Sequence, residues 1–347
     1  MSAGNDILLR VEGRAGHATF NRPQALNALS YDMAMALEAA LDDWRDDPAV
    51  DMVLIDAEGE KAFCAGGDIN ALYTTGKTGN LDYARTFWAD EYRLNAKIAA
   101  FPKPYVALMD GIVMGGGVGV SAHGSYRIVT DRTMLAMPEC GIGLIPDVGG
   151  TWLLGHAPGR IGEYLGLTGA RIGAADAIHA GFADLFVPSE ELDDLKARLI
   201  ATGDPSSISE FAAEPPAGDL AGIEADLETV FSGATVADVR KALGRIEAEW
   251  AGKAAKAIDR GSPISLACTL EMVRAARNDA SVADSLRREY RFVSRCMEHG
   301  DFLEGVRAAI IDKDRNPAFA GGEPANREKV DFMLSEPEGG DIGIEDR

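Results

Sequence analysis

Two glycine-rich stretches in the middle of this chain combine residue types that can do acyl chemistry. The first, 110–119, reads DGIVMGGGVG and follows an apolar run at 105–109. Its three consecutive glycines let a backbone N–H at the start of a helix approach an oxygen that is gaining negative charge, which the helix dipole favours. The second stretch, 137–150, places two carboxylates, Glu139 and Asp147, on glycine-flanked turns. Because carboxylates can attack an acyl group or activate water, the two stretches together have the parts of a thioester site.

Two other motifs overlap the first stretch but fit their patterns poorly. The segment 117–122, GVGVSA, matches the GxGxxG/A pattern of dinucleotide-binding turns. The acidic residue after the next strand, Asp131, follows too closely, since about 20 residues are expected between them. The segment 119–123, GVSAH, is similar to the GxSxG turn that carries a nucleophilic serine, but His123 replaces the second glycine. The sequence therefore disfavours both a nucleotide-dependent dehydrogenase and a serine hydrolase.

Composition narrows the class of protein further. The 347 residues carry a formal net charge of −21, which opposes binding to nucleic acid or to an anionic membrane. The five histidines and four cysteines show no HxxxH or CxxC spacing, so we expect neither a metal site nor disulfides. There is no basic, apolar leader and no run of about twenty apolar residues. We expect a protein of the reducing cytoplasm.

The elements that must position the two glycine-rich stretches alternate between strand and helix, which indicates an α/β fold. Ser30 is the expected N-cap of a helix that ends near Asp47, because apolar residues recur there at helical spacing. Alternating or continuous apolar runs predict strands at 7–11, 17–20, 52–55, 105–109, 126–129 and 134–136.

The chain changes character after about residue 202. Residues 203–218 are rich in glycine and proline, and from there to about 311 nearly every segment has a helical pattern. We expect a core at 1–202, a helical C-terminal region at 203–320 and an acidic, solvated and mobile tail at 321–347.

With Phe63-Cys-Ala-Gly-Gly-Asp-Ile69 upstream, the two stretches resemble the crotonase (enoyl-CoA hydratase/isomerase) superfamily. The resemblance runs from FNRPQALNAL at 20–29 to EGVRAAIIDKD at 304–314, and 262–305 is most similar to the 3-hydroxyisobutyryl-CoA hydrolase branch. It implies a ββα spiral core followed by a helical region, and an acyl-CoA substrate with no separate cofactor. A homo-oligomer is left open.

The resemblance also implies roles for individual residues. The N–H groups of Gly67 and Gly116 would form the oxyanion hole, beside the carboxylates of Glu139 and Asp147. Glu91 would contact substrate, although by pattern alone it is a surface helix residue. The further substrate-binding positions are Ala65, Asp68 and Ile69.

We therefore expect hydrolysis of a short 3-hydroxyacyl-CoA, with Glu139 acting as nucleophile or as general base. Asp147 would bind the 3-hydroxyl or orient the water, although it could instead cap a helix beginning near Val148. One alternative is an enoyl-CoA hydratase, but the family's first catalytic glutamate falls here on Gly119. Another is a non-catalytic acyl-CoA-binding protein, which has no need of paired carboxylates.

Overall fold

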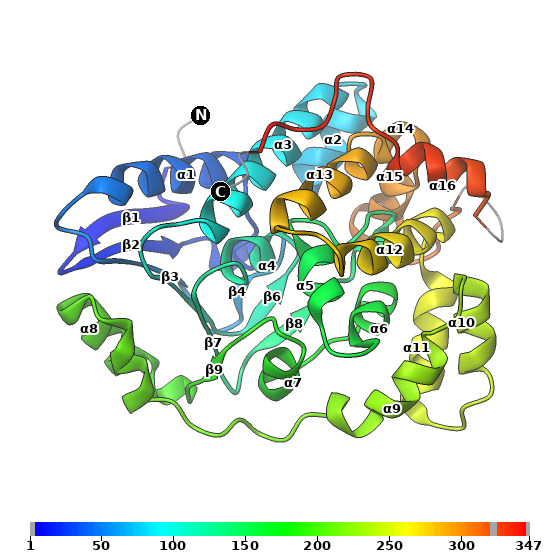
Figure 1. The fold of residues 1–347 in the computed structure, drawn as a ribbon. Helices are drawn as coiled ribbons and strands as arrows, with labels where there is room; N and C mark the ends of the chain where they lie inside the picture. The colour runs from blue at the N-terminus through cyan, green and yellow to red at the C-terminus, as the bar shows by residue number, and fades with distance from the viewer. Residues whose placement is uncertain (1–3, 320–324, 345–347) are drawn as a thin grey trace.

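The computed structural model describes residues 4–319 and 325–344 and contains two β-sheets enclosed by helices (Figure 1). In the larger sheet, β1 and β2 are antiparallel and the remaining neighbours are parallel. Its order is β1 (Ile7–Glu12), β2 (Ala15–Phe20), β3 (Met52–Ala57), β5 (Tyr105–Met109), β7 (Tyr126–Val129) and β9 (Leu185–Phe186). The smaller sheet is parallel, with the order β4 (Ala62–Cys64), β6 (Ile112–Met114) and β8 (Met134–Ala136).

The two sheets are built by a repeated connection. Each of three turns of the chain gives one strand to the larger sheet and the next strand to the smaller one, before a helix returns. The returning helices are α2 (Ile69–Lys77) and α3 (Leu81–Ala99), then α4 (Gly116–Ser121), then α5 (Gly150–His156). The expected α/β class and ββα spiral are confirmed. Every expected strand is present, whereas β4, β6 and β9 have only two or three residues each and were not predicted.

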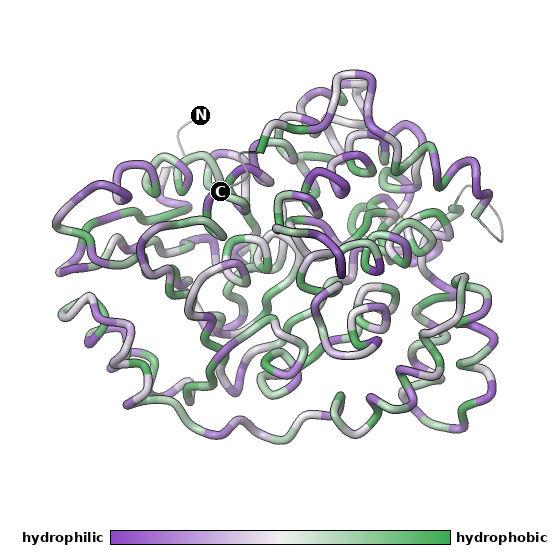
Figure 2. The backbone as a smooth tube through the Cα atoms, in the orientation of Figure 1, coloured by the Kyte–Doolittle hydropathy of each residue, from purple (hydrophilic) through white to green (hydrophobic). Residues whose placement is uncertain are grey.

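Helices cover both faces of the larger sheet. On one face lies α1 (Tyr31–Asp46), which Ser30 caps as expected by accepting a hydrogen bond from Met33 N. On the other face lies α8 (Leu192–Thr202), whose buried leucines pack on Leu54 and Val106 in a second, smaller core. Because both faces are covered, the central strands are largely apolar, with β5 reading YVALM, and Figure 2 shows green along them.

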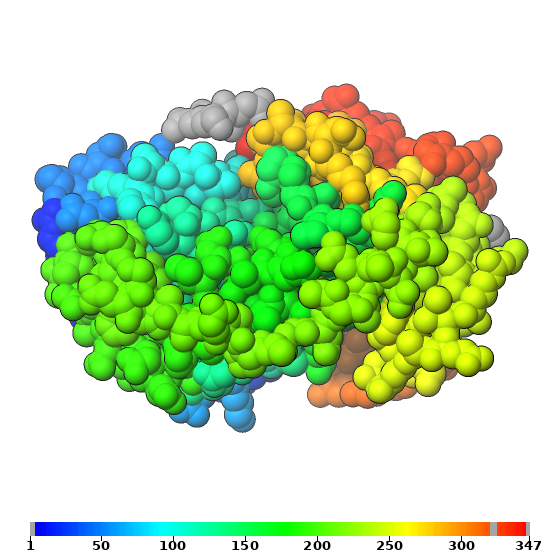
Figure 3. All heavy atoms as spheres, turned by 60° about the horizontal axis from the view of Figure 1, so that its bottom comes forward, coloured from blue at the N-terminus to red at the C-terminus, as the bar shows by residue number. Residues whose placement is uncertain are grey.

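The C-terminal region is helical, as expected, and it contributes to the main core. The stretch 203–219 runs along the outside of the molecule (Figure 3). Two later helices pack on the core: α12 (Pro263–Ala276) contacts α5 and α6 (Ile161–Thr168), and α13 (Val282–Val293) contacts α3. The others are α9 (Leu220–Val230), α10 (Val236–Leu243), α11 (Glu249–Arg260), α14 (Cys296–His299), α15 (Phe302–Val306) and α16 (Arg327–Leu334).

The expected acidic tail differs from what the structure describes at 325–344. Helix α16 buries Val330 and Met333, and the chain beyond it buries Ile342 and Ile344. Acidic composition was a poor guide here, because Asp341 pairs with Arg291 of α13 and is thereby neutralised. This part of the tail is packed, not solvated, and the rest of it, 321–324 and 345–347, lies outside the described residues. The positions of the two boundaries between the three expected regions stay a prediction.

Candidate active site

The carboxyl ends of the three short strands define the site. In a parallel sheet these ends share one edge, and ligands commonly bind there. The pairing of Cys64 with Val113 and of Met114 with Ala136 aligns the three ends. Directly after them come the turn at 65–67, the glycines at 115–117 and the segment at 137–139. The smaller sheet therefore brings together loops that lie far apart in the sequence.

The two expected oxyanion donors lie next to each other. A Cβ atom placed on Gly116 would lie 3.3 Å from the backbone N of Gly67. Gly67 forms an isolated bridge to Leu29, in which its neighbours make the hydrogen bonds. Within the described residues neither Gly67 N–H nor Gly116 N–H donates a hydrogen bond. Two adjacent, uncommitted N–H groups, one of them at the start of α4, can bind an oxyanion.

Two glutamate side chains point at these glycines. A Cβ atom on Gly115 would lie 3.1 Å from Oε1 of Glu139, and one on Gly116 would lie 2.9 Å from Oε1 of Glu91. Any larger residue at 116 would therefore displace a carboxylate. Oε2 of Glu139 and Oε1 of Glu91 are buried and have no hydrogen-bond partner among the described residues. Buried polar atoms are seldom left unpaired outside functional sites.

Glu91 shows where the prediction from the pattern was wrong. The sequence pattern indicated a surface residue of α3, but the side chain is only 3% exposed. Helix α3 is covered by α13 as well as by the core, so both of its sides carry buried residues. Glu91 instead lies beside Gly116, and its contact with substrate stays a prediction.

Asp147 joins this group through Tyr92, the residue next to Glu91 on α3. The hydroxyl of Tyr92 donates a hydrogen bond of 2.8 Å to Oδ2 of Asp147. Helix α5 begins at Gly150 with Gly149 as its N-cap, so Asp147 does not cap it. The alternative interpretation of Asp147 as a capping residue is wrong.

The site carboxylates share an unusual electrostatic environment. Burial raises the pKa of Glu139 and of Glu91 well above the ordinary value, and the negative charge of Asp147 raises both further. Burial also raises the pKa of Asp147 to about 7, although the Tyr92 hydrogen bond opposes the shift. Three carboxyl groups with raised pKa values at the edge of one sheet are typical of an acid–base site.

Gly119 lies one turn beyond Gly116 and has no room for a side chain. A Cβ atom there would lie 2.7 Å from Cβ of Val148 and 2.8 Å from Nδ2 of Asn95. In folded proteins a Cβ atom essentially never lies within 3.0 Å of another residue's heavy atom, and the Cβ of Val148 can move only with its backbone. A glutamate at 119 would therefore require Val148 and Asn95 to move.

The remaining expected binding residues border the oxyanion turn. Ala65 N donates to Leu26 O, and Asp68 N donates to Leu29 O, so the turn is tied to the segment before α1. The Asp68 side chain makes no capping bond to α2 and instead lies 3.3 Å from Arg22. Ile69, the first residue of α2, packs against the core. The three residues lie together, and their contact with substrate stays a prediction.

Sequence reasoning missed Tyr92 and Glu289, two of the side chains that hydrogen-bond to the segment 147–151. Tyr92 follows Glu91 directly in the sequence, and this adjacency was the signal that could have identified it as a site residue. Glu289 lies on α13 in the C-terminal region, and nothing local distinguishes it from a surface glutamate.

No metal-ligand pattern marks this site among the described residues. Hollows of about 360 and 480 Å³ lie elsewhere, one beside His123 and Trp152 and one beside Asp56 and Lys196. In the described ranges, 4–319 and 325–344, no cluster of histidine, cysteine or acidic side chains has the arrangement of a metal site. The chemistry of the convergent groups is what identifies the site.

Known proteins are similar to this chain in sequence and in fold. It is 40% identical to the mitochondrial 3-hydroxyisobutyryl-CoA hydrolase of Gallus gallus, over 94% of this chain and 86% of that protein. It is 41% identical to the corresponding protein of Danio rerio, over 91% and 85%. It is 38% identical to 3-hydroxyisobutyryl-CoA hydrolase 1 of Arabidopsis thaliana, over 97% and 92%.

Two solved structures are similar over nearly their whole length. One, described as an enoyl-CoA hydratase from Rhodobacter sphaeroides, has a TM-score of 0.93 and 46% identity, covering 98% of this chain and all of that one. The other, described as a carnitinyl-CoA dehydratase from Mycobacterium thermoresistibile, has a TM-score of 0.91 and 44% identity, covering 97% and 98%. Residues 15–333 match the Enoyl-CoA hydratase/isomerase family. With this match, the spiral fold and the loops at one edge of its smaller sheet, the chain belongs to the enoyl-CoA hydratase/isomerase family.

Proposed function

We propose that this protein hydrolyses 3-hydroxyisobutyryl-CoA to 3-hydroxyisobutyrate and CoA, a step of valine breakdown. The observation that carries the proposal is that Glu139 and Glu91 lie against the turns that hold the uncommitted N–H groups of Gly67 and Gly116, while residue 119 is a glycine and supplies no carboxylate. The relatives from chicken, zebrafish and Arabidopsis, named as hydrolases of this substrate, support the choice of acyl group.

The first step concerns the thioester oxygen. The N–H groups of Gly67 and Gly116 hold it while the carbonyl carbon becomes tetrahedral, and they need not reorganise because the two loops are already adjacent. Losing one such donor typically costs about 2.7–4 kcal/mol of transition-state stabilisation. Here the donors are backbone groups, so only changes that displace the glycines would remove them.

Glu139 supplies the reacting carboxylate by one of two routes. As a base it takes a proton from water, whose oxygen attacks the carbonyl carbon, and the proton then goes to sulfur as the carbon–sulfur bond breaks. As a nucleophile it forms an anhydride and expels CoA thiolate, and water then cleaves the anhydride. Burial raises the pKa of Glu139, which makes its ionised form a stronger base in the first route and a stronger nucleophile in the second.

Asp147 would accept a hydrogen bond from the 3-hydroxyl of the substrate. Oδ2 accepts from Tyr92, which leaves Oδ1 for a second donor. Burial raises the pKa of Asp147, so a hydroxyl donor would also stabilise an otherwise poorly solvated carboxylate. Tyr92 and Asp147 together would then favour hydroxylated acyl groups.

Hydration of an enoyl-CoA is the second candidate, because the two solved structures are described as a hydratase and a dehydratase. Adding water across a double bond needs a base for the water and an acid for the α-carbon. Gly119 offers neither, and its contacts with Val148 and Asn95 leave no space for a carboxylate. This packing favours hydrolysis over hydration.

A protein that only binds acyl-CoA is the third candidate. Such a protein has no use for buried carboxyl groups whose side-chain oxygens lack partners, because those groups cost stability. Glu91 and Glu139 both have such oxygens. Their presence supports a catalyst.

The experiment compares two reactions in one preparation. We expect release of free thiol from 3-hydroxyisobutyryl-CoA, and slower release from isobutyryl-CoA, while the conjugated absorbance of crotonyl-CoA stays nearly constant. Hydration of crotonyl-CoA at a rate equal to or above hydrolysis would favour the hydratase instead.

Location and assembly are less constrained. None of the helices formed by the described residues is both long and apolar enough to span a bilayer. The cytoplasmic location stays a prediction, because the chicken and zebrafish relatives are named as mitochondrial proteins. The partner we propose is the acyl-CoA substrate, with no separate cofactor, and homo-oligomerisation is left open.

A further inference from the structure

The backbone that carries Asp147 has an unfavourable conformation. Val148 has φ of +55°, and Gly149 follows with φ of +79°. A β-branched residue rarely adopts the left-handed region, because its side chain crowds the backbone. Such a conformation persists only where surrounding groups hold it, and it is found most often at functional sites.

Two of the groups that hold the backbone of Val148 in this conformation belong to the core. The Tyr92 hydroxyl binds the Asp147 carboxylate, and Nε2 of His123 lies 2.8 Å from the carbonyl oxygen of Val148. Burial lowers the pKa of His123 to about 4, so at neutral pH the ring is uncharged and donates its Nε2–H to that carbonyl. These contacts hold the side chain of one residue and the carbonyl group of the next.

The third group that holds this backbone, Glu289, comes from the C-terminal region. Oε2 of Glu289 on α13 accepts the N–H of Gly149 at 2.8 Å, and Oε1 accepts the N–H of Thr151 at 2.9 Å together with the Thr151 hydroxyl. The Glu289 side chain is fully buried. No basic side chain in the described part of the chain forms an ion pair with it, so three neutral donors are all that its carboxylate receives.

We propose that Glu289 is a positioning residue that sets the place of Asp147 in the active site. Its oxygens hold Gly149 and Thr151 on the C-terminal side of the strained Val148, while Tyr92 holds Asp147 on the other side. A hydrogen bond from Gly150 N to Asp147 O, 2.6 Å long, closes the turn between them. A shift at Gly149 is therefore transmitted to the Asp147 carboxylate.

A carboxylate is required because an amide of the same shape cannot accept on both sides. In Glu289→Gln, one terminal group becomes NH₂ and faces either Gly149 N–H or the Thr151 donors. At least one buried donor then loses its acceptor, which releases the turn. Thr151→Val is the milder change, because it removes only the hydroxyl and leaves both backbone hydrogen bonds.

The inference rests on the proposed hydrolysis, so the test starts with thiol release from 3-hydroxyisobutyryl-CoA by the wild-type protein. We expect Glu289→Gln to lower kcat/KM by about 100-fold, as a displacement of about 1 Å at a catalytic group can. Binding of CoA, followed by calorimetry, should stay within about twofold, since Glu289 is an acidic, fully buried residue that a phosphate would not bind. Thr151→Val should lose less than Glu289→Gln.

The decisive arm is the double variant Asp147→Asn/Glu289→Gln. If Glu289 acts through Asp147, removing it after Asp147 is already altered should cost less than about twofold more. A merely structural role would instead give two penalties that multiply. The matched control is Glu163→Gln, because Glu163 is equally buried but pairs with Arg160 and Arg277, away from this turn.

The outcomes separate the two claims. No thiol release by the wild-type protein would overturn the proposed function, and this inference with it. An active wild type, with Glu289→Gln turning over normally or with multiplying penalties in the double variant, would overturn the inference alone. If Glu289→Gln does not fold, Glu289→Asp takes its place, because the shorter side chain cannot accept from both Gly149 N–H and Thr151 N–H. Unchanged kcat/KM in that variant would overturn the inference.

Discussion

Two aspartates of this protein are buried to the same extent, and their carboxyl groups behave in opposite ways. Asp56 and Asp147 are each 5% exposed. Burial works to raise the pKa of Asp56, but the hydrogen bond and charge of His17 and the charge of Lys196 outweigh it and lower that pKa to about 2. Burial raises the pKa of Asp147 to about 7. Equal burial therefore does not imply an equal protonation state.

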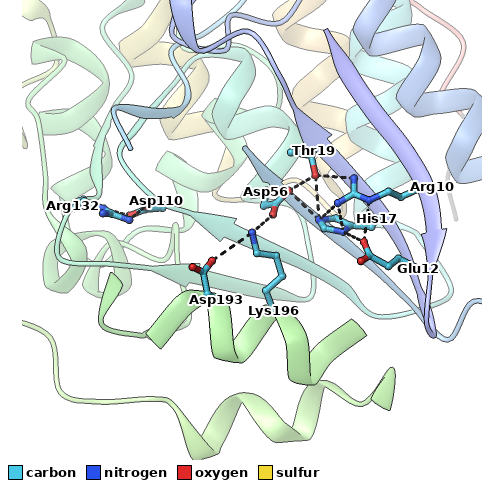
Figure 4. Close-up of polar contacts among 9 residues, drawn as sticks. All are labelled: Arg10, Glu12, His17, Thr19, Asp56, Asp110, Arg132, Asp193 and Lys196. Carbon is cyan, nitrogen blue, oxygen red and sulfur yellow. Dashed lines mark hydrogen bonds and ion pairs between the residues drawn. The ribbon is translucent and has the colours of Figure 1, made fainter. Parts of the chain in front are cut away.

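The difference lies in the neighbours. Figure 4 shows Asp56 at the centre of an ionic cluster, with Oδ1 near His17 and Thr19 and Oδ2 at 2.9 Å from Lys196. Lys196 belongs to α8, so this cluster ties that helix to the larger sheet. Asp147 has Tyr92 as its hydrogen-bond partner. Its carboxyl neighbours Glu91 and Glu139 have pKa values raised by burial and, further, by the negative charge of Asp147 itself.

The comparison separates charge used for stability from charge kept for chemistry. A buried carboxylate surrounded by cations is stabilised as an ion and reacts poorly as a base. A buried carboxyl group without cations is destabilised as an ion, so it accepts a proton or a substrate hydroxyl readily. The larger sheet has the first kind and the loop edge of the smaller sheet has the second.

The largest effect that we expect is on turnover by Glu139→Gln. Removing the reactive carboxyl group should lower kcat by about 10³–10⁴-fold, in the upper range for a general base, while CoA still binds. Thiol release and calorimetric titration with CoA measure the two quantities. A variant that turns over normally, or one that no longer binds CoA, would place the chemistry elsewhere.

Asp56→Asn should instead reduce stability and spare turnover. Breaking a buried ion pair leaves Lys196 and His17 without their carboxylate, which should lower the free energy of unfolding by about 3 kcal/mol at pH 7. Denaturant unfolding measures this, and kcat per folded molecule should not change. Asp193→Asn is the control, since Asp193 is 98% exposed and its contact with Lys196 should contribute little. Equal effects of both variants would contradict the comparison.

Gly119→Ala tests the packing behind the site. Its Cβ would lie 2.7 Å from Cβ of Val148, so overpacking should cost about 1–3 kcal/mol of stability and should not create hydratase activity. Unfolding curves and the crotonyl-CoA absorbance assay measure the two outcomes. An alanine variant as stable as the wild type would mean that Val148 yields easily.

The sharpest contrast between the two aspartates is the pH dependence of stability. The pKa of Asp147 is raised from 3.8 to about 7 in the folded protein, so its stabilising contribution is complete below pH 4 and is lost as the pH rises to 7. The pKa of Asp56 is lowered from 3.8 to about 2, so its contribution is present above pH 4 and is lost as the pH falls to 2.

Asparagine cannot ionise, so Asp147→Asn should raise Tm relative to the wild type by increasing amounts between pH 4 and pH 8. A gain of about 1 kcal/mol corresponds to roughly 2–4 °C for a domain of 150–250 residues. Differential scanning calorimetry across this pH range measures it, and a Tm difference that shrinks with rising pH would contradict the pKa direction. The same variant should lose more kcat/KM with 3-hydroxyisobutyryl-CoA than with isobutyryl-CoA.

The features that could be predicted from the sequence are those with a local physical cause. Strands and α1 were predictable, because burial on one or both sides leaves a periodic apolar pattern in a local segment. The strands of the smaller sheet were harder, since β4, β6 and β8 are each three residues long. Glu139 and Asp147 were identified because glycines and prolines flank them.

Other parts of the site could not be predicted locally. Glu91 has the pattern of an exposed helix residue, and only the packing of α13 on α3 buries it. Glu289 acts on residues about 140 positions earlier, a relation that a single sequence does not record. The prediction for the acidic tail was wrong because composition does not show that arginines on α13 pair with Asp341 and bind the Ile344 carbonyl.

Arginines of α3 and α13 bind the C-terminal segment, so this segment connects two helices that carry residues of the site. Arg93 of α3 donates to the carbonyl of Gly343, and Arg287 of α13 donates to the carbonyl of Ile344. Helix α3 carries Glu91 and Tyr92, and α13 carries Glu289. Trimming the chain after 335 to remove an acidic end would remove these hydrogen bonds from both helices, together with the ion pair of Asp341 with Arg291.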